Sequence, residues 1–367
     1  MPSKKKSSGN SQAQKLNKQI HVTSTGSECS SQLPFVSICT PTFNRRPFWD
    51  MAIKCFNDYD YPKDRMEWII IDDGTDKIED LVSHIPQVKY FKYDSQMILG
   101  KKRNIMHDKT QGDIIIYQDD DDYYPPDRVS HAVHTLTENP KALCAGSSIV
   151  YVYFKHISQM YKFGPHGPNH ATAGTFAFRR ELLRQTRYDD NKAIAEESDF
   201  LKKYTIPFVQ LDPVKTILVF PHIHNTCDKK DLLVYAPNPV CNPEMEVSIN
   251  TILKNKSIYD FFITNLDETL SGYLPGDPKY KVEVNKQVAI IKQNNEKLME
   301  EHRIKKQESQ AVDAKKIIED ANKRIQEERG KAIQVMVQNK KMLIKLREYE
   351  KRLDIEPADA FVETSSI

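Results

Sequence analysis

The chain has 367 residues, of which 39% are hydrophobic and 28% charged, a length that accommodates two or three domains. Its 53 Lys and Arg residues nearly balance 51 Asp and Glu residues, which argues against a nucleic-acid binder because such proteins carry a strongly basic surface. No apolar run approaches the roughly 20 residues of a membrane-spanning helix, and the start lacks the apolar core of a secretory signal. Six cysteines without close pairing predict neither a zinc finger nor a disulfide framework, so the composition fits a soluble, cytoplasmic protein.

Composition divides the chain into five segments. Polar and basic residues with little to bury fill the start, which predicts a disordered tail over 1–33. The basic residues of this tail, Lys4, Lys5 and Lys6, leave open a peripheral contact with a membrane. The remaining predicted segments are an α/β domain at 34–230, a connector with one short helix (Ser257–Leu266) at 231–279, a long helix at 280–353 and a second tail at 354–367.

Short apolar runs alternate with amphipathic stretches in the α/β segment. The runs predict buried parallel strands at Phe35–Cys39, Trp68–Ile71, Val88–Tyr93 and Ile114–Tyr117. The stretches between them predict crossover helices at Pro47–Phe56, Asp76–His84 and Lys101–Lys109. This alternation is typical of an open α/β sheet, whose ligands bind outside the carboxyl ends of the strands.

Polar residues follow the first two predicted strands directly. The run Thr40–Arg45 comes after the first strand, where backbone N–H groups and hydroxyls can meet a ligand, although such a run alone is typical of an ordinary turn. Asp72 and Asp73 follow the three isoleucines of the second strand. An Asp there can accept hydrogen bonds from a nucleotide base or ribose, and helix capping by Asp73 or Thr75 is the structural alternative.

The strongest signal follows the fourth predicted strand, where Asp119–Asp122 places four carboxylates in a row. Adjacent like charges raise each other's pKa and destabilise the fold unless a cation neutralises them. In an extended backbone Asp119 and Asp121 would share one face. Oxygen ligands of this kind suit Mg²⁺ or Mn²⁺. An acidic surface turn is the alternative, and a second acidic strand end in the same sheet argues against it.

Three further sites carry charged groups or histidines. The basic run Lys101–Asn104 opens a helix between the two acidic strand ends and is suited to pair with a phosphate. The stretch Ala195–Leu201, which contains Glu196 and Glu197, opens an amphipathic helix, and its acids either compensate the helix dipole or serve as a general base. Two histidines after the predicted strand Thr216–Phe220 are spaced so that both can point to one face, as metal ligands or as structural residues: His222 and His224.

The segment 280–353 has an interrupted heptad pattern. Steps of four and three residues from Ala314 reach mostly apolar positions, among them Ile325, Leu346 and Leu353. An earlier register, from Val284 to Leu298, is out of phase with it. The pattern predicts a long helix that self-associates or pairs with a partner coiled coil, and a helical tail folded back on its own domain is the alternative.

Four of these motifs occur in an order known from one enzyme family. The motifs are Val36–Asn44, Ile70–Gly74, Lys102–Asn104 and Asp119–Asp122 with Pro126. Together they resemble the family 2 glycosyltransferases of GT-A fold, over residues 34–228. The resemblance implies a Rossmann-like, mostly parallel sheet with flanking helices, here followed by a long helix or coiled coil.

The resemblance also implies roles for individual residues. Nucleotide-sugar binding falls to Thr40, Pro41, Asn44, Asp72, Arg103, Asp119 and Asp120. Among them, Asp72 matches the acid that contacts the base, and Asp119 is the first acid of the D-x-D motif, which usually meets the ribose. Asp121 matches the metal-binding acid, with Mn²⁺ or Mg²⁺ as the cofactor and His222 or His224 as a weaker further ligand. Glu197 falls where the family places its catalytic base, with Glu196 as its rival.

The implied reaction is transfer of a single sugar, with inversion and metal assistance, from a nucleotide-sugar donor to a hydroxyl of an unknown acceptor. A UDP-sugar is favoured as donor, and the missing Q-x-x-R-W signature after Glu197 argues against a processive synthase. One alternative is a degenerate GT-A scaffold that acts through its coiled coil. Another is nucleotidyl transfer, which normally uses a glycine-rich loop after the first strand, and Thr40–Arg45 has no glycine.

Overall fold

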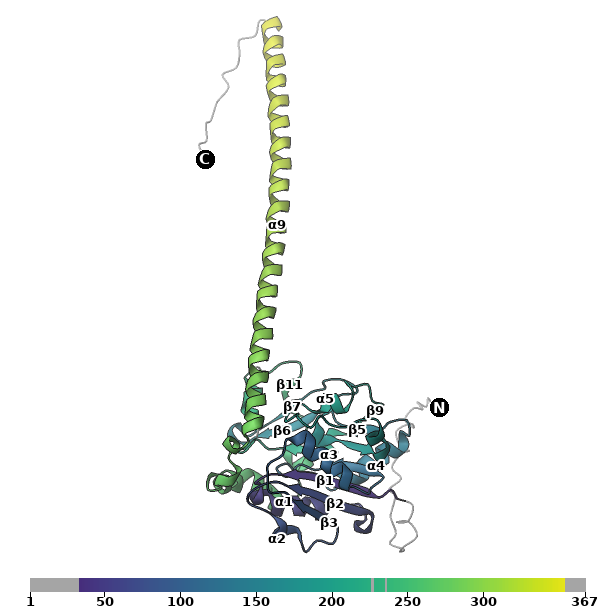
Figure 1. The fold of residues 1–367 in the computed structure, drawn as a ribbon. Coiled ribbons are helices and arrows are strands. Elements are labelled where there is room, and N and C mark those ends of the chain that lie inside the picture. The colour runs from purple at the N-terminus through teal and green to yellow at the C-terminus, as the bar shows by residue number, and fades with distance from the viewer. Residues whose placement is uncertain (1–32, 226–227, 235, 354–367) are drawn as a thin grey trace, which may run out of the picture. The chain divides into compact units, whose positions relative to one another are not determined.

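The computed structural model describes residues 33–225, 228–234 and 236–353 (Figure 1). The predicted tails at 1–33 and 354–367 lie outside the described residues apart from Leu33, and so do Cys29 and Cys227. The other four cysteines are buried, unpaired thiols. No helix among the described residues combines the length and the apolar character needed to cross a bilayer.

A seven-stranded mixed sheet forms the centre of the fold, in the order β3-β2-β1-β4-β8-β5-β9. Strands β3, β2, β1 and β4 are mutually parallel, whereas β8 runs antiparallel to both β4 and β5. The α/β prediction is therefore confirmed. The strands are β1 (Val36–Thr42), β2 (Met66–Asp72), β3 (Val88–Lys92), β4 (Ile114–Tyr117), β5 (Cys144–Gly146), β8 (Ala177–Arg179) and β9 (Phe208–Gln210).

The central strands are buried and mostly apolar because both of their faces are covered. In β4, Ile116 belongs to the core on one face of the sheet, and its neighbours Ile115 and Tyr117 belong to the core on the other. The first core includes apolar residues of α1 (Trp49–Asp58) and α4 (Arg128–Glu138), and the second includes Met106 of α3 (Leu99–Lys109). The edge strand β3 is only half-buried, contrary to prediction.

Two predicted helices are shorter in the structure. Helix α2 covers only Glu79–Val82 of the predicted Asp76–His84. The helix predicted to open at Ala195 is a single turn, α5 (Glu197–Phe200). Positive φ angles of 53° at Ala195 and 48° at Lys202 interrupt the helical path on both sides of this turn.

A second, four-stranded sheet was not predicted as a unit. Its order is β10-β6-β7-β11, with β10 (Leu218–Val219), β6 (Val150–Phe154), β7 (Gln159–Phe163) and β11 (Cys241–Pro243). Only β10 coincides with a predicted strand, Thr216–Phe220. Leu218 exchanges two backbone hydrogen bonds, of 2.9 and 3.0 Å, with Tyr123. This bridge fixes the segment after β10 next to the acidic turn.

The chain divides into two compact units, at Val288 and Ala289. The first includes the predicted connector, whose apolar residues, such as Ile258 and Leu266, join the main core. Helices of this part are α6 (Ile249–Ile252), α7 (Lys256–Asp260) and α8 (Leu266–Ser271), and a π-helical turn joins α7 to α8. Helix α9 (Val282–Leu353) begins near the end of the first unit and continues through the second, and none of its residues is buried.

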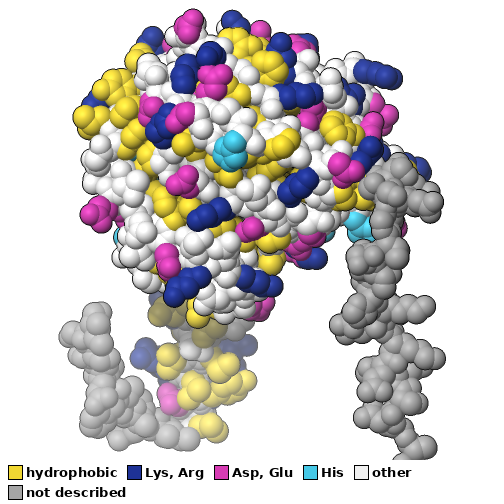
Figure 2. Space-filling view, turned by 90° about the horizontal axis from the view of Figure 1, so that it is seen from below, with side chains coloured by type: hydrophobic (Ala, Val, Ile, Leu, Met, Phe, Trp, Pro, Cys, Tyr) yellow, Lys and Arg dark blue, Asp and Glu magenta, His cyan; other side chains and the backbone are white. Residues whose placement is uncertain are grey.

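One face of the molecule mixes charges of both signs. On the face shown in Figure 2, Lys and Arg side chains alternate with Asp and Glu and with scattered apolar groups. No continuous basic area appears on this face, which agrees with the nearly balanced charge of the chain.

His107 of α3 is buried in the second core. Its Nε2 lies 2.5 Å from the hydroxyl of Tyr117, and the rings of Phe178, Tyr188 and Phe200 surround it. Burial, assisted by the charge of Arg103, lowers the pKa of His107 to about 3. The folded chain therefore holds a neutral imidazole at pH values where the unfolded chain binds a proton.

We predict that this histidine makes the fold acid-sensitive. Between pH 6.5 and about 3 the unfolded state binds the extra proton, so the free energy of unfolding falls as the pH falls. His107→Gln removes this linkage. Between pH 7 and pH 5, the wild type should lose ~2 kcal/mol relative to the variant, measured by urea denaturation at each pH. Parallel pH profiles for the two proteins would contradict the prediction.

Candidate functional site

The acidic turn after β4 is held by its own backbone and by neighbouring side chains. The carbonyl of Gln118 accepts a hydrogen bond from Thr40 Oγ1 (2.7 Å), and the side chain of Gln118 accepts one from the Tyr59 hydroxyl (2.7 Å). The N–H of Asp119 donates to the Tyr124 hydroxyl (2.9 Å). These bonds fix where the chain leaves the sheet and so fix the four carboxyls that follow.

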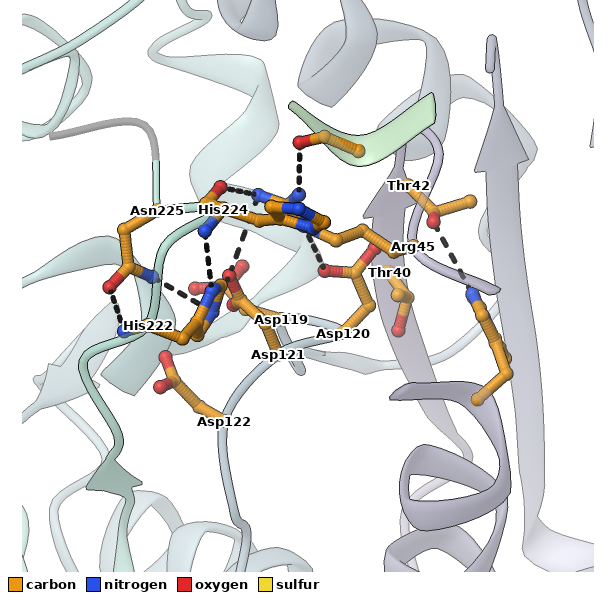
Figure 3. A network of polar contacts seen from close by, with 12 residues as sticks. Thr40, Thr42, Arg45, Asp119, Asp120, Asp121, Asp122, His222, His224 and Asn225 are labelled. Carbon is orange, nitrogen blue, oxygen red and sulfur yellow. Dashed lines mark hydrogen bonds and ion pairs between the residues drawn. The ribbon is translucent and has the colours of Figure 1, made fainter. Parts of the chain in front are cut away.

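Asp121 is the carboxyl of this turn that the structure holds ionised. His222 Nε2 lies 3.1 Å and Arg45 Nη2 3.7 Å from its Oδ2 (Figure 3). Burial opposes its ionisation, but the hydrogen bond with His222 and the charges of Arg45 and Lys229 outweigh burial and hold the pKa of Asp121 well below its usual range.

The neighbouring carboxyls behave in the opposite way. Burial, and then the charge of Asp121, raises the pKa of Asp120 to about 7. Burial raises the pKa of Asp122 to about 8, and it also raises the pKa of Asp119. An additional cation near the turn would favour ionisation of these three groups.

The two histidines after β10 occupy different places. The imidazole of His222 contacts Asp121 and also Asn225, whose Nδ2 is 2.9 Å from His222 Nε2. The side chain of His224 is not beside Asp121, and His224 acts through its carbonyl, which accepts a 2.6 Å hydrogen bond from Arg45. The two side chains therefore do not form the common face that their spacing suggested. Burial lowers the pKa of each imidazole to about 4.

The two adjacent glutamates also differ. Glu196 is buried and accepts a 3.0 Å hydrogen bond from Nε of Arg103, which is buried as well. Glu197 is half-buried, and its Oε1 accepts one bond, from the N–H of Ala173 (3.2 Å). Arg103 keeps one buried nitrogen, Nη1, without a hydrogen-bond partner among the described residues. That nitrogen is available to a ligand.

A cavity of about 220 Å³ lies at the carboxyl ends of β1 and β4. Cationic and acidic side chains share its wall, which is a typical arrangement for a phosphate ligand with a metal ion. Its lining includes Pro41, Phe43, Arg45, Lys102, Arg103, Asp119, Asp120, Asp121 and Lys281. Lys102 is not free in this wall, because its ammonium group pairs with Asp73.

A second cavity, of about 490 Å³, shares Arg103, Asp119 and Asp121 with the first. Its other polar groups include Glu196 and Glu197. The four-stranded sheet and neighbouring residues provide an apolar wall that contains Val150, Val152, Phe163, Ile217 and Val219. The two cavities therefore meet at the acidic turn, and the glutamate pair lies in the second.

Three predicted binding residues do not line the first cavity. Thr40 is fully buried and bonds to Gln118 and Trp68. Asn44, at a φ of 51°, accepts hydrogen bonds from the N–H groups of Thr75 (2.7 Å) and Asp76 (2.9 Å). These contacts shape the loops around the cavity.

Asp72 is the third of these residues. One of its oxygens accepts from Gly74 N–H (2.9 Å), and the other accepts from Ile78 N–H (3.1 Å) and the Tyr90 hydroxyl (2.6 Å). Both oxygens therefore have internal partners. A contact from Asp72 to a nucleotide base stays a prediction.

Several residues of the site were not singled out from the sequence. Lys102 belonged to the basic run, but nothing in the run distinguished it from Arg103. Phe43 and Arg45 lay within the first polar run. Lys281 lies outside every motif, and no sequence signal pointed to it.

The Asp121–His222 pair fits a divalent cation that takes most of its ligands from elsewhere. Carboxylate oxygens suit Mg²⁺ and Mn²⁺, and Mg²⁺ is commonly held by one or two carboxylates together with water and substrate phosphates. Among the residues that the structure describes, no group of three or more His, Cys, Asp or Glu side chains converges on a common metal position. Phosphate oxygens or water would have to complete the coordination.

Comparisons with known proteins match the region around the acidic turn. Residues 37–193 match the model of the family Glycosyl transferase family 2. An uncharacterized glycosyltransferase of Haemophilus influenzae is 29% identical over 121 residues, which are 31% of this chain and 47% of that protein. The chain thus spans about half the length of this curated relative.

Solved structures are similar at lower identity. TarS 1–349 of S. aureus is 16% identical, with a TM-score of 0.42 over 50% of this chain and 60% of that one. The mannosyltransferase PcManGT of Pyrobaculum calidifontis, solved with GDP-Man and Mn²⁺, is 16% identical, with a TM-score of 0.42 over 52% of this chain and 57% of that one.

The family match begins in β1, ends at Ala193 and contains β2, α3, β4 and the acidic turn. It therefore covers the strand ends and loops that form most of the first cavity. Over residues 37–193 the chain is therefore similar to glycosyl transferase family 2.

Proposed function

We propose that the protein is a glycosyltransferase that moves one sugar from a nucleotide-sugar donor to an acceptor hydroxyl, with inversion at the anomeric carbon. The observation that carries the proposal is the meeting of two cavities at Asp119 and Asp121 within the region that is similar to family 2. One cavity has the cations and acids suited to a nucleoside diphosphate, and the other contains Glu197.

The donor would occupy the first cavity. Arg103 has a free buried nitrogen for it, and Asp119, Asp120 and Pro41 line the same space. A UDP-sugar is the first candidate. Three other predicted residues would contribute to donor binding indirectly, by holding the loops around the cavity in place: Thr40, Asn44 and Asp72.

A divalent metal, Mn²⁺ or Mg²⁺, would be held by Asp121 and His222. When bound, such an ion neutralises charge on the diphosphate leaving group. The low pKa of Asp121 keeps this carboxyl ready as a ligand over the physiological pH range. His224 lies apart from Asp121 and is the weaker candidate of the two histidines.

Glu197 would be the general base. As the acceptor oxygen attacks the anomeric carbon, Glu197 takes the hydroxyl proton, the new glycosidic bond forms, and the bond to the nucleoside diphosphate breaks. Glu196 is less suited to this task, because its carboxylate is paired with Arg103. Glu196 instead positions Arg103 between the two cavities.

We also propose that α9 associates with a second copy of the chain. Apolar side chains spaced four and three residues apart are exposed along the part of α9 in the second unit, for example Ile325 (51% exposed) and Leu346 (54%). Lys, Arg, Glu and Asp side chains of both signs lie between them, as in coiled coils. Association would bury this apolar seam.

The metal proposal predicts the behaviour of Asp121→Asn. UDP and GDP are titrated into the protein by calorimetry, with and without Mn²⁺, and the wild type should bind one of them more tightly with the metal. The variant should lose at least tenfold in the metal-dependent affinity, or ~1.4 kcal/mol. Asp127→Asn, at a carboxyl that lines neither cavity and pairs with Lys215 at 3.5 Å, is the control and should bind as the wild type does. Metal-independent binding in the wild type would contradict the metal's role.

The base assignment predicts different effects for the two glutamates. Glu197→Gln should keep donor affinity and stability but lower kcat by a factor of ~10²–10⁴ in a sugar-transfer assay. Glu196→Gln leaves the buried Arg103 without a charged partner and should lower the free energy of unfolding by about 3 kcal/mol. Normal turnover by Glu197→Gln would reject this residue as the base.

The association of α9 is tested by sedimentation equilibrium of the full chain. Leu346→Glu changes a seam position, whereas Ile344→Glu changes a position of similar exposure (52%) on the opposite side of the helix. We expect Leu346→Glu to shift the oligomer to monomer and Ile344→Glu to leave it intact. A wild type that is monomeric at all concentrations would instead indicate a different partner.

A further inference from the structure

The segment Tyr273–Val288, which lies outside the family match, is anchored beside β1 and β2. Tyr273 donates a 2.8 Å hydrogen bond to Asp76. The carbonyls of Pro275 and Gly276 accept hydrogen bonds from Asn44 (2.9 Å) and Arg45 (3.4 Å). These contacts attach the segment to the loop that follows β1, at the wall of the first cavity.

Close packing fixes the same part of the segment. A side chain at Gly276 would place a Cβ 2.6 Å from Nδ1 of His224 and 3.0 Å from the carbonyl of Asn44. Only glycine fits at this distance without a shift of its neighbours. The segment is therefore fitted against the residues that hold Arg45.

The other end of the segment is anchored to the loop that precedes the glutamates. Gln287 accepts a 2.9 Å hydrogen bond from the N–H of Ala193 and donates one of 2.8 Å to the carbonyl of Asn191. Ala193 lines both cavities. The segment thus connects the β1 loop and the loop before Glu196, and two of its residues, Lys281 and Val284, line the first cavity.

Lys281 brings a positive charge to the acidic turn. Burial and the charge of Arg45 lower the pKa of Lys281 to about 7, against the opposing effect of Asp121 and Asp120. An anionic group in the cavity would favour the charged ammonium form. Because lysine binds phosphates as a compact point charge, its place in a cavity with Arg103 and the metal-binding acid suits a diphosphate.

We propose that Lys281 binds the diphosphate of the donor and that Lys281 and Val284, held in place by the segment Tyr273–Val288, are part of the donor site. This inference rests on the proposed function and adds to it a residue that lies beyond the family 2 match. Lys281 would hold the diphosphate in the ground state and stabilise the charge that grows on it as the sugar departs. A donor site without this segment would be incomplete.

The test compares ligands with and without phosphates. UDP and uridine, or GDP and guanosine if the wild type binds GDP, are titrated into the full chain with Mn²⁺ present. Lys281→Met should weaken binding of the diphosphate about tenfold, or ~1.4 kcal/mol, and leave the affinity for the nucleoside unchanged. Lys281→Arg keeps the charge and should recover most of the lost affinity.

Lys286→Met is the matched control. Lys286 lies in the first turns of α9, which begins directly after Lys281; it is exposed and pairs with Glu283 at 3.4 Å, so its loss should change neither affinity. Equal weakening of UDP and uridine binding by Lys281→Met, or no weakening of either, would overturn the inference and leave the proposed function standing. Failure of the wild type to bind any of these nucleotides would reject the proposed function and the inference together.

If Lys281→Met does not fold, Lys281→Gln is tested instead, because it places a neutral polar group at the same position. Its thermal unfolding is measured with and without UDP. If UDP raises the melting temperature of Lys281→Gln as much as that of the wild type, the inference is overturned. A smaller increase in the variant would support it.

Discussion

The arrangement of the site depends on one electrostatic constraint, the partial burial of four consecutive carboxyls at the end of β4. Such a turn is unfavourable by itself, because each charge is desolvated and lies next to another of the same sign. The chain offsets this with basic groups drawn from distant segments. These groups are Arg45, Arg103, Lys229 and Lys281, together with the hydrogen-bonding His222. Three of these groups, Arg45, Arg103 and Lys281, also line the first cavity, where an anionic ligand would bind.

The sequence predicted those parts of the fold that have a local signature. A buried strand followed at once by acids is a short-range pattern, so β2, β4 and the acidic turn were identified with good boundaries. Of the four-stranded sheet only β10 was predicted; β11 contains three residues, too few for a periodic pattern, and the five-residue strands β6 and β7 were not singled out. The single turn of α5 was missed because positive φ angles at Ala195 and Lys202 are not evident from residue types.

Residues of the candidate site were predictable from the sequence only where each belongs to a local motif. Asp119–Asp121 and Arg103 line a common cavity, because strand ends and a helix start meet at one edge of the sheet, and the roles predicted for them stay predictions. Tertiary packing decides between His222 and His224, and it also brings Lys281 to the site. A further difficulty is that a side chain suited to accept a hydrogen bond from a ligand can equally accept one from an N–H or O–H group of the protein. This is what Thr40, Asn44 and Asp72 do.

The order of the charged groups along the chain has a consequence for folding during synthesis. His222 follows its partner Asp121 by 101 residues, and Lys281 is made later still. A growing chain folds from its N-terminal end, so the strands of the parallel sheet are available well before His222, Lys229 and Lys281. Until these segments leave the ribosome, the nascent domain has only the earlier Arg45 and Arg103 to offset the carboxyls at that sheet edge. Assembly of this corner of the sheet is therefore a late event in folding, although most of its acids belong to the first half of the chain.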